Sequence, residues 1–298
     1  MLIERFLLYI TNERNYSPLT VRSYRTDLEQ WRDFVTRSGN TDLISRATPT
    51  DIRRWLLVRS QAGDGPLTLR RKTQSLRAFY RYLMKSGEAA DNPAAEIDLA
   101  KMPKHLPQYV REANMDSLLD SELDENDFTQ VRNRLMLMMM YETGIRRAEL
   151  ISLRDVNVDA DKCELKVHGK RDKDRIVPFG PELKHYIDMY RHLRNVQVGT
   201  VASEFFVRES GKPIYPSLVY KVVHDSMMSV GGSDQKSPHV LRHSFASAML
   251  NSGAGINSVK ELLGHQSLAA TQIYTHITFG ELKDSYKHAH PRALKKGG

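Results

Sequence analysis

A basic segment that holds two prolines and shows no hydrophobic periodicity divides this chain of 298 residues into two parts. It consists of Lys101-Met102-Pro103-Lys104-His105-Leu106-Pro107, and prolines spaced in this way exclude both a helix interior and a central strand. Because a domain usually has about 100–200 residues, the length also favours two domains. We therefore predict a helical domain over residues 1–99, a linker over 100–108 and a mixed domain over 109–298.

Helix signals dominate the first part. Ser17-Pro18, Thr48-Pro49 and Pro66 mark helix starts, and Gly39 and Gly87 mark helix ends. Together with a helix before Ser17, these signals predict a four-helix unit in which each helix has one apolar face to bury. The outward faces are expected to carry six basic residues: Arg22, Arg25, Arg70, Arg71, Lys72 and Arg77.

Most of the net positive charge lies in the same part of the chain. Residues 1–107 hold 18 lysines and arginines against 12 acidic residues, which gives +6 of the formal net charge of +8. Basic residues repeated on several helix faces favour contacts with the phosphates of a nucleic acid. Ordinary solubilising charge is the alternative explanation.

Several classes of protein are not expected. No stretch approaches the roughly 18 consecutive apolar residues that a membrane-spanning helix needs, so we expect no insertion into a membrane. The start, Met1-Leu2-Ile3-Glu4-Arg5, lacks the pattern of a secretory signal. The single cysteine, Cys163, excludes an intrachain disulfide and a cysteine-based zinc cluster. These features predict a cytoplasmic protein.

The second part has a mixed pattern. Alternation of Cys163, Leu165 and Val167 favours a strand. Helices are predicted at about 114–121, 128–142 and 147–152, short strands at 155–159, 163–168 and 174–178, and helices again from about 180 to 290. The sequence therefore predicts a mainly α chain with one small sheet.

Two motifs hold arginines in positions suited to phosphate. Gly144 breaks an apolar helix, and Arg146 follows in the turn before the next helix, where a guanidinium can bind phosphate in a bidentate manner. His239 and Arg242 lie three residues apart near a helix start, so both side chains share one face. The alternatives are a surface arginine at 146, core packing of the second pair, and a zinc site from His239 and His243 that lacks a third ligand.

Two further motifs hold groups that can move a proton or attack phosphorus. Lys170 lies at the tip of a predicted strand–turn–strand, as a proton donor to a leaving oxygen or as a solvated turn residue. His265 follows a glycine that ends a short apolar helix, and Tyr274 follows it nine residues later. A tyrosine can form a covalent ester with phosphorus and leave again, although its ordinary pKa of about 10 requires activation. A half-buried helix tyrosine is the alternative.

Taken in order, these motifs resemble those of the tyrosine recombinase (phage-integrase-like) family, most closely the bacterial XerC/XerD chromosome-dimer-resolving recombinases. The matching motifs are Thr-Gly-Ile-Arg and Glu-Leu within 143–150, Gly-Lys at 169–170, His-Val-Leu-Arg-His-Ser-Phe-Ala at 239–246, Leu-Leu-Gly-His at 262–265 and Ile-Tyr-Thr-His at 273–276. The resemblance implies a mainly α fold. Its parts would be an N-terminal four-helix, SAM-like core-binding domain and a C-terminal α+β catalytic domain with a small antiparallel sheet.

The resemblance also implies a catalytic set of six residues: Arg146, Lys170, His239, Arg242, His265 and the nucleophile Tyr274. The arginines would clamp the scissile phosphate, the lysine would protonate the 5′-oxygen, and the histidines would hydrogen-bond the phosphate. No cofactor and no metal are implied, because arginines supply the electrostatic stabilisation. Arg171 stands where the family usually has glycine, which leaves Lys173 as a second candidate for the acid, and Glu149 is expected to orient Arg146.

The implied partners are duplex DNA with a specific recombination site, sister protomers in a tetramer on that DNA, and a DNA translocase. The segment from Glu281 to Ala293 would be the element passed between protomers. The implied activity is site-specific recombination through a 3′-phosphotyrosyl intermediate, which would resolve chromosome dimers during segregation. The alternatives are a mobile-element integrase, a non-catalytic DNA-binding protein on the same fold, and a phosphodiesterase or topoisomerase that shares the covalent step.

Overall fold

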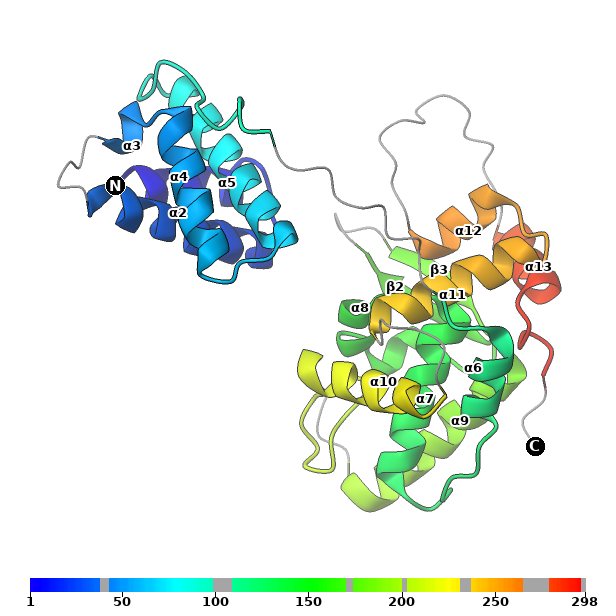
Figure 1. Cartoon of the computed structure of the whole chain (residues 1–298). Coiled ribbons are helices and arrows are strands. Elements are labelled where there is room, and N and C mark those ends of the chain that lie inside the picture. Colours follow the sequence, from blue (N-terminus) through cyan, green and yellow to red (C-terminus); the bar gives the residue numbers. More distant parts are fainter. Residues whose placement is uncertain are drawn as a thin grey trace. The chain divides into compact units, whose positions relative to one another are not determined.

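The computed structural model describes residues 1–37, 43–98, 109–169, 174–199, 203–230, 237–264 and 279–295. The chain divides into two compact units, Met1–Lys104 and His105–Gly298 (Figure 1). The linker predicted at 100–108 lies outside the described residues.

All regular elements in the described part of the first unit are helices. Its helices are α1 (Leu2–Asn12), α2 (Pro18–Thr36), α3 (Leu43–Arg46), α4 (Pro49–Gln61) and α5 (Pro66–Lys85). The predicted starts are confirmed: the Ser17 side chain accepts a hydrogen bond from the Thr20 backbone N–H, and Thr48 forms a capping box with Asp51. The short helix α3 is an addition to the four predicted helices, and Gly39 lies outside the described residues.

Aromatic side chains form the core of this unit. Trp31 of α2 packs edge-on against Trp55 of α4, and its indole nitrogen donates a buried hydrogen bond of 3.0 Å to the Tyr80 hydroxyl of α5. Phe6 of α1 packs edge-on against Phe79 of α5. The four longer helices are therefore joined through one core, and their opposite faces are left to solvent.

The second unit combines helices with one small sheet. In chain order its elements are α6 (Glu112–Leu119), α7 (Phe128–Thr143), α8 (Arg147–Ile151), η1 (Asp155–Asn157), β1 (Val158–Asp159), β2 (Glu164–His168), β3 (Asp174–Pro178), α9 (Pro181–Leu193), η2 (Arg194–Val198), α10 (Pro216–Val230), α11 (Pro238–Asn251), α12 (Ile256–Leu263) and α13 (Phe279–Ala289). The strand predicted over 155–159 is wrong in its first three residues, which form a 3-10 turn. There the carboxylate of Asp155 binds the guanidinium groups of Arg191 and Arg194.

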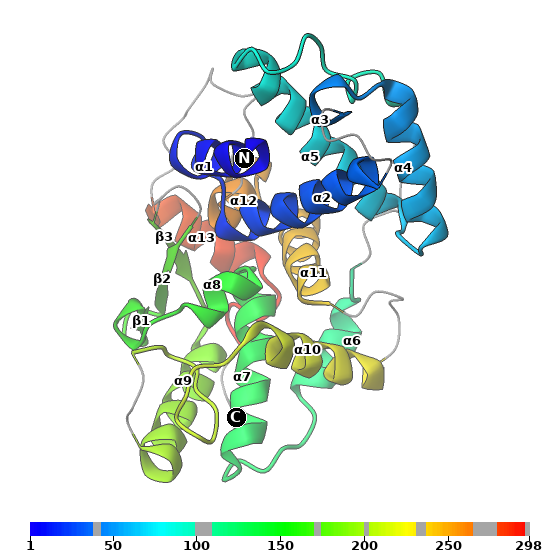
Figure 2. The same cartoon turned by 90° about the vertical axis from the view of Figure 1, so that its left-hand side faces the viewer.

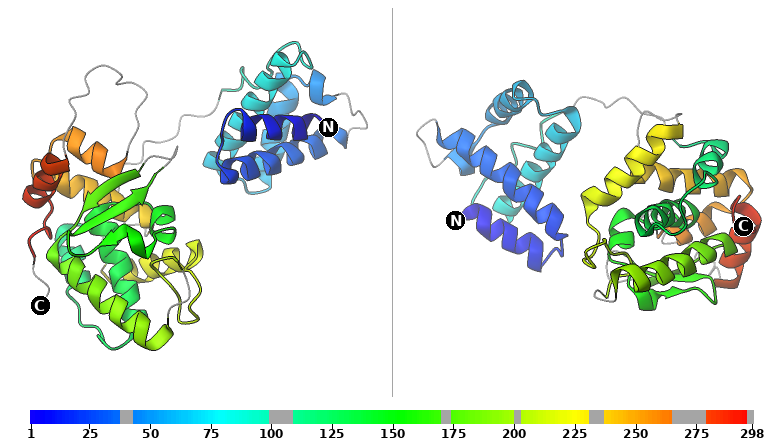
Figure 3. Two further views of the ribbon diagram at one scale, coloured as in Figure 1. Left: turned by 180° about the vertical axis from the view of Figure 1, so that it is seen from behind. Right: turned by 90° about the horizontal axis from the view of Figure 1, so that it is seen from below.

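The sheet is antiparallel, with the strand order β1-β2-β3. His168 pairs with Asp174 at the end of the ladder where β2 leads into β3, and Leu165 pairs with Val177 on its buried face. Strand β3 contacts α12 and α13, as Figure 3 shows from behind. Strand β3 begins directly after residues 170–173 and contacts α12, which ends shortly before His265. It therefore lies between two segments of the chain that hold predicted catalytic residues.

Helix α7 runs through the middle of the second unit (Figure 2) and contacts α6, α8, α9, α10 and α11. Its side chains from Leu135 to Tyr141 are buried. Asp127 caps its start by accepting backbone hydrogen bonds from Thr129 and Gln130, and Gly144 caps its end. The end of a rigid central helix thus fixes the turn that carries Arg146. Among the described residues, no helix is both long and apolar enough to cross a bilayer.

Candidate active site

The site begins at the glycine that ends α7. Gly144 has a φ of 60°, in the left-handed region that favours glycine. A Cβ atom there would lie 2.5 Å from Cδ1 of Phe245 and 2.8 Å from Cδ2 of Leu263. Both the backbone conformation and the space therefore require glycine, and the chain turns directly into the start of α8.

Arg146 is the N-cap residue of α8 and is held by Glu149. The Glu149 carboxylate accepts from the Arg146 backbone N–H at 2.7 Å and from its Nη1 at 2.6 Å. The Nη2 atom of Arg146 donates to the carbonyl of Gly264 at 3.1 Å. The Arg146 side chain is 28% exposed, whereas that of Glu149 is 6% exposed, so the guanidinium keeps a face open to a ligand. The predicted orienting contact from Glu149 is confirmed.

Arg242 approaches the same turn from α11. Its Nη1 donates to the carbonyl of Gly144 at 2.5 Å, and its Nη2 donates to the carbonyl of Leu263 at 2.6 Å. Burial and the nearby charge of Arg146 lower the pKa of Arg242 to about 10. The guanidinium therefore stays protonated at neutral pH, and two neutral carbonyls hold it without cancelling its charge.

His239 lies on the first turn of α11, three residues before Arg242, and its side chain is exposed. Partial desolvation is the largest cause that lowers the pKa of His239 below its ordinary value. The charge of Arg147 and those of His243 and Arg242 on α11 act in the same direction. A neutral imidazole at neutral pH can accept a proton. The site thus combines an imidazole that can accept a proton with the nearby charge of Arg242 on the same helix.

The remaining candidates are two lysines, a histidine and a tyrosine. Lys170 and Lys173 fall in 170–173, and His265 and Tyr274 fall in 265–278; both segments lie outside the described residues. Within the described ranges, no three His, Cys, Asp or Glu side chains come together as metal ligands.

The sequence did not single out Arg175, which belongs to the same cluster. This residue of β3 donates through Nη1 and Nη2 to the two oxygens of Glu149, at 3.0 and 2.8 Å, and through Nε to the carbonyl of Leu262 at 2.8 Å. The alternation of residues along the predicted strand could have indicated a buried role for Arg175. Residue 175 shares a face with the buried Val177, and a charged residue at an inward position needs a buried partner.

The basic residues predicted on the outward faces of the first unit differ in their surroundings. Arg22 and Arg70 are exposed, whereas Arg25 binds Glu4 and Arg71 binds Asp27. Arg77 donates to the carbonyls of Ala94 and Ile97, at 3.0 and 2.8 Å, so it supports the end of this unit.

The outward placement of Lys72 is wrong. Its side chain is 2% exposed, and its Nζ lies 3.3 Å from the fully buried carboxylate of Asp27 and 5.7 Å from the centre of the Trp55 ring. The reason is electrostatic, because a carboxylate buried in the core requires a cation beside it.

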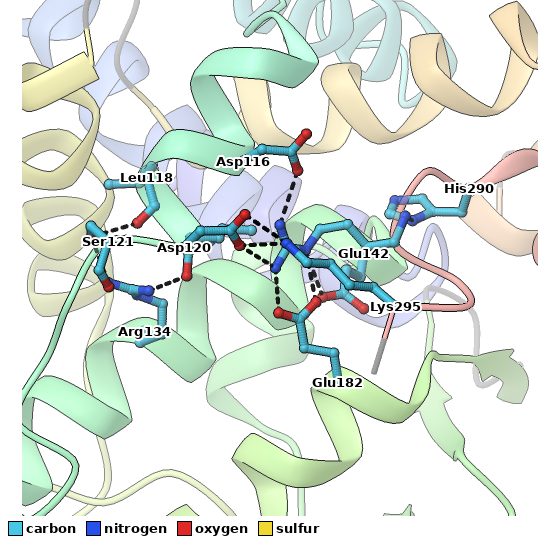
Figure 4. A network of polar contacts seen from close by, with 11 residues as sticks. Asp116, Leu118, Asp120, Ser121, Arg134, Glu142, Glu182, His290 and Lys295 are labelled. Carbon is cyan, nitrogen blue, oxygen red and sulfur yellow. Dashed lines mark hydrogen bonds and ion pairs between the residues drawn. The ribbon is translucent and has the colours of Figure 1, made fainter. Parts of the chain in front are cut away.

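The C-terminal segment packs on its own unit. Helix α13 contacts α11, α12 and β3, and the guanidinium of Arg292 beyond it is 1% exposed. Arg292 donates to Glu182 of α9 and, at 2.9 Å each, to Asp116 of α6 and to Asp120, the C-cap residue of α6 (Figure 4). These three carboxylates, together with the nearby Glu142 of α7, form a socket for the segment that we call the Arg292 socket.

Comparison with known families decides the identity. The model of the phage integrase family matches residues 108–281, and that of its N-terminal SAM-like domain matches residues 3–87. The chain belongs to this family of tyrosine recombinases. The recombinase is 34% identical to the tyrosine recombinase XerC of Chlorobaculum parvum over 317 aligned positions, which cover 98% of this chain and 94% of that protein. It is 36% identical to XerC of Escherichia coli, covering 98% and 97%.

Among solved structures, the XerH site-specific recombinase bound to its difH substrate has the same fold. The TM-score is 0.68 at 21% identity, and the match covers 95% of this recombinase and 83% of that chain. The predicted fold class is confirmed: a SAM-like helical domain and a catalytic domain with a three-stranded antiparallel sheet. The recombinase is an enzyme that cleaves and rejoins DNA, rather than a non-catalytic DNA-binding protein.

Proposed function

We propose that this recombinase acts at a specific site in duplex DNA and resolves chromosome dimers during segregation. The observation that carries the proposal is its similarity to XerC proteins over 98% of the chain. The alternative within the family is integration of a mobile element, which would use the same chemistry at different sites.

In the proposed reaction, Arg146 and Arg242 bind the non-bridging oxygens of the scissile phosphate. Hydrogen bonds to the carbonyls of Gly264 and Gly144 hold the guanidinium groups of Arg146 and Arg242, respectively, and Arg146 keeps an exposed face. Charge that develops on the phosphate in the pentacoordinate transition state is stabilised by cations already fixed in place.

The covalent step is proposed to use Tyr274 as the nucleophile. Its oxygen forms a bond to phosphorus while the bond to the 5′-oxygen breaks, which yields a 3′-phosphotyrosyl link. His239 takes the tyrosyl proton, which agrees with its lowered pKa. Lys170 protonates the leaving 5′-oxygen, with Lys173 as the second candidate, and His265 hydrogen-bonds the phosphate. Attack by a 5′-hydroxyl of the partner strand then reseals the DNA.

We further propose that the two domains, 1–99 and 109–298, hold the duplex between them through the linker at 100–108. Exposed Arg22 and Arg70 would contact backbone phosphates, which set register rather than sequence. Four protomers, two from each of two sister recombinases, would act on two duplexes, and a DNA translocase would select the active pair. The segment from Glu281 to Ala293 would pass between protomers and enter the Arg292 socket of a neighbour.

Trapping the covalent intermediate tests the chemistry. The recombinase is incubated with a library of nicked genomic duplexes and analysed by denaturing electrophoresis. An adduct that Tyr274→Phe abolishes supports the proposal, and sequencing of the trapped DNA gives the site. A single chromosomal site supports dimer resolution, whereas sites at the ends of a mobile element support the integrase. Absence of any adduct across the library contradicts the proposed chemistry.

The proposed exchange of the C-terminal segment has its own test. A chain truncated after Phe279 is compared with the full chain by gel filtration on a duplex that carries the recombination site. Loss of the tetrameric complex is expected. An unchanged complex would show that the segment is not the connection between protomers.

A further inference from the structure

The end of α12 binds three arginines at once. The carbonyls of its last two residues, Leu262 and Leu263, and of its C-cap residue Gly264 each accept from a different guanidinium. The donors are Arg175 of β3 at 2.8 Å, Arg242 of α11 at 2.6 Å and Arg146 of the α8 start at 3.1 Å. A helix C-terminus carries partial negative charge on such carbonyls, so it attracts cations. Three elements are thus fixed relative to one helix end.

Arg175 differs from the other two arginines in its exposure and its partners. Its side chain is 12% exposed against 28% for Arg146. Two of its nitrogens bind the two oxygens of Glu149 and the third binds the α12 end, so every nitrogen of its guanidinium is engaged. Arg175 is therefore less available to a ligand than Arg146.

Glu149 connects Arg175 to Arg146. Each Glu149 oxygen accepts two hydrogen bonds, one from Arg175 and one from Arg146. Although burial favours the neutral carboxyl, the hydrogen bonds and charges of both arginines lower the pKa of Glu149 below its ordinary value. If Arg175 were removed, the carboxylate would lose half of its donors and its connection to β3.

We propose that Arg175 is a positioning residue for DNA cleavage, which fixes Glu149 and the end of α12 so that Arg146 and Arg242 meet the scissile phosphate in the correct geometry. This inference rests on the phosphate-binding role proposed above for those two arginines. Arginine is required because only a planar fork with three nitrogens reaches both Glu149 oxygens and the Leu262 carbonyl. Lysine, with one nitrogen, can keep the charge but cannot span these acceptors.

The test uses single-turnover cleavage of a nicked duplex by the full chain. Arg175→Ala is expected to lower the cleavage rate ~10²-fold, because small misplacements of positioned groups have effects of that order. DNA affinity, measured by gel shift, is expected to stay within about twofold, because Arg175 does not contact the phosphate. The cleavage rate of Arg175→Lys is expected to lie between those of Arg175→Ala and the wild type.

Two readouts separate positioning from a loss of folded structure. In Arg175→Ala the pKa of Glu149 should rise. As the pH is lowered, the cleavage rate of the variant should therefore begin to fall at a higher pH than that of the wild type. Guanidinium chloride, well below unfolding concentrations, should restore part of the rate. Arg191→Ala is the matched control, because that guanidinium binds Asp155 and the Val158 carbonyl instead. It should show neither the pH shift nor the rescue.

The outcomes are distinct. Wild-type cleavage rates in Arg175→Ala or Arg175→Lys would overturn the proposal, as would equal losses of binding and cleavage with no pH shift and no rescue. If Arg175→Ala does not fold, Arg175→Lys with its pH profile decides. If the wild type forms no adduct under the same conditions, the proposed chemistry fails instead.

Discussion

The guanidinium of Arg242 donates to the carbonyl of Gly144 at 2.5 Å, which ties α11 to the end of α7. The helix that carries one of the two arginines proposed to bind phosphate is thereby joined to the turn that carries the other, Arg146. Any change that moves this turn should disturb both arginines together.

Gly144→Ala tests that connection. The added Cβ would lie 2.5 Å from Phe245 on a backbone with positive φ, so we expect a loss of ~1–3 kcal/mol in the free energy of unfolding. The cleavage rate should also fall, because the turn at Gly144 carries Arg146. Gly253→Ala is the control, because Gly253 also has positive φ but no atom within 4 Å of an added Cβ. Equal destabilisation of the two variants in urea unfolding would argue against a steric role.

Arg146→Lys tests whether position 146 needs the several donors of a planar guanidinium or only a positive charge. The variant keeps the charge but loses the simultaneous contacts with Glu149 and the Gly264 carbonyl. We expect single-turnover cleavage to fall ~10²–10³-fold, the usual effect of removing one donor to a developing oxyanion. The exposed Arg154 offers a control, and Arg154→Lys should cleave normally. A near-normal rate in Arg146→Lys would mean that charge alone suffices.

Arg147→Gln should raise the pKa of His239. After partial desolvation, the charge of Arg147 is the next cause that disfavours the imidazolium, so its removal favours protonation. Titration of the His239 ring by NMR measures the shift directly. The acid limb of the cleavage rate should move to higher pH in parallel if His239 is the base. Arg208→Gln, which removes an arginine that stacks on Tyr215, should leave this titration unchanged.

Substitutions of Lys72 and Arg70 should affect different properties: the first should lower stability, and the second should lower DNA affinity. Lys72→Met leaves the buried Asp27 with one cation fewer and is expected to lower the free energy of unfolding by about 3 kcal/mol. Arg70→Gln, at an exposed position, should leave stability within about 0.5 kcal/mol. It should instead lower DNA affinity and reduce the salt slope by about 1. If Lys72→Met instead lowered DNA affinity and left stability unchanged, Lys72 would be a DNA contact after all.

Arg292→Ala should weaken the packing of the C-terminal segment. It leaves the carboxylates of Glu182, Asp116 and Asp120 without their shared cation, and we expect a loss of ~3–5 kcal/mol. Although burial acts to raise it, contacts with Lys295 and Arg292 lower the pKa of Asp120 below its ordinary 3.8.

The stabilising contribution of Asp120 is therefore fully present above pH ~4 and disappears as pH falls through the lowered pKa. The difference in stability between the wild type and Arg292→Ala should shrink over that acid range. Urea unfolding at several pH values measures it. A pH-independent difference would show that lost packing dominates.

Sequence signals predicted the features that depend on near neighbours. The caps at Ser17 and Thr48 and the turn at Gly144 each involve groups within a few residues, so their patterns are local. The order of the motifs then predicted the family.

What the sequence did not predict depends on distant partners. The side of the helix on which Lys72 lies is decided by Asp27, 45 residues earlier, and the role of Arg175 is decided by Glu149, 26 residues earlier. Arg292 meets Glu182 from 110 residues away. In each case an ionic pair inside the fold overrides the local pattern, because a buried charge must find a partner wherever the chain brings one.

The three carbonyls at the end of α12 have a consequence for the energetics of the reaction. They hold three guanidinium groups through dipoles, and the single negative charge of Glu149, which binds two of these groups, compensates only part of the three positive charges. The electrostatic work of gathering like charges is therefore done when the protein folds, before DNA arrives. In the proposed reaction, the surrounding dipoles would need little reorientation when negative charge builds on the phosphate, and this preorganisation would lower the barrier relative to water.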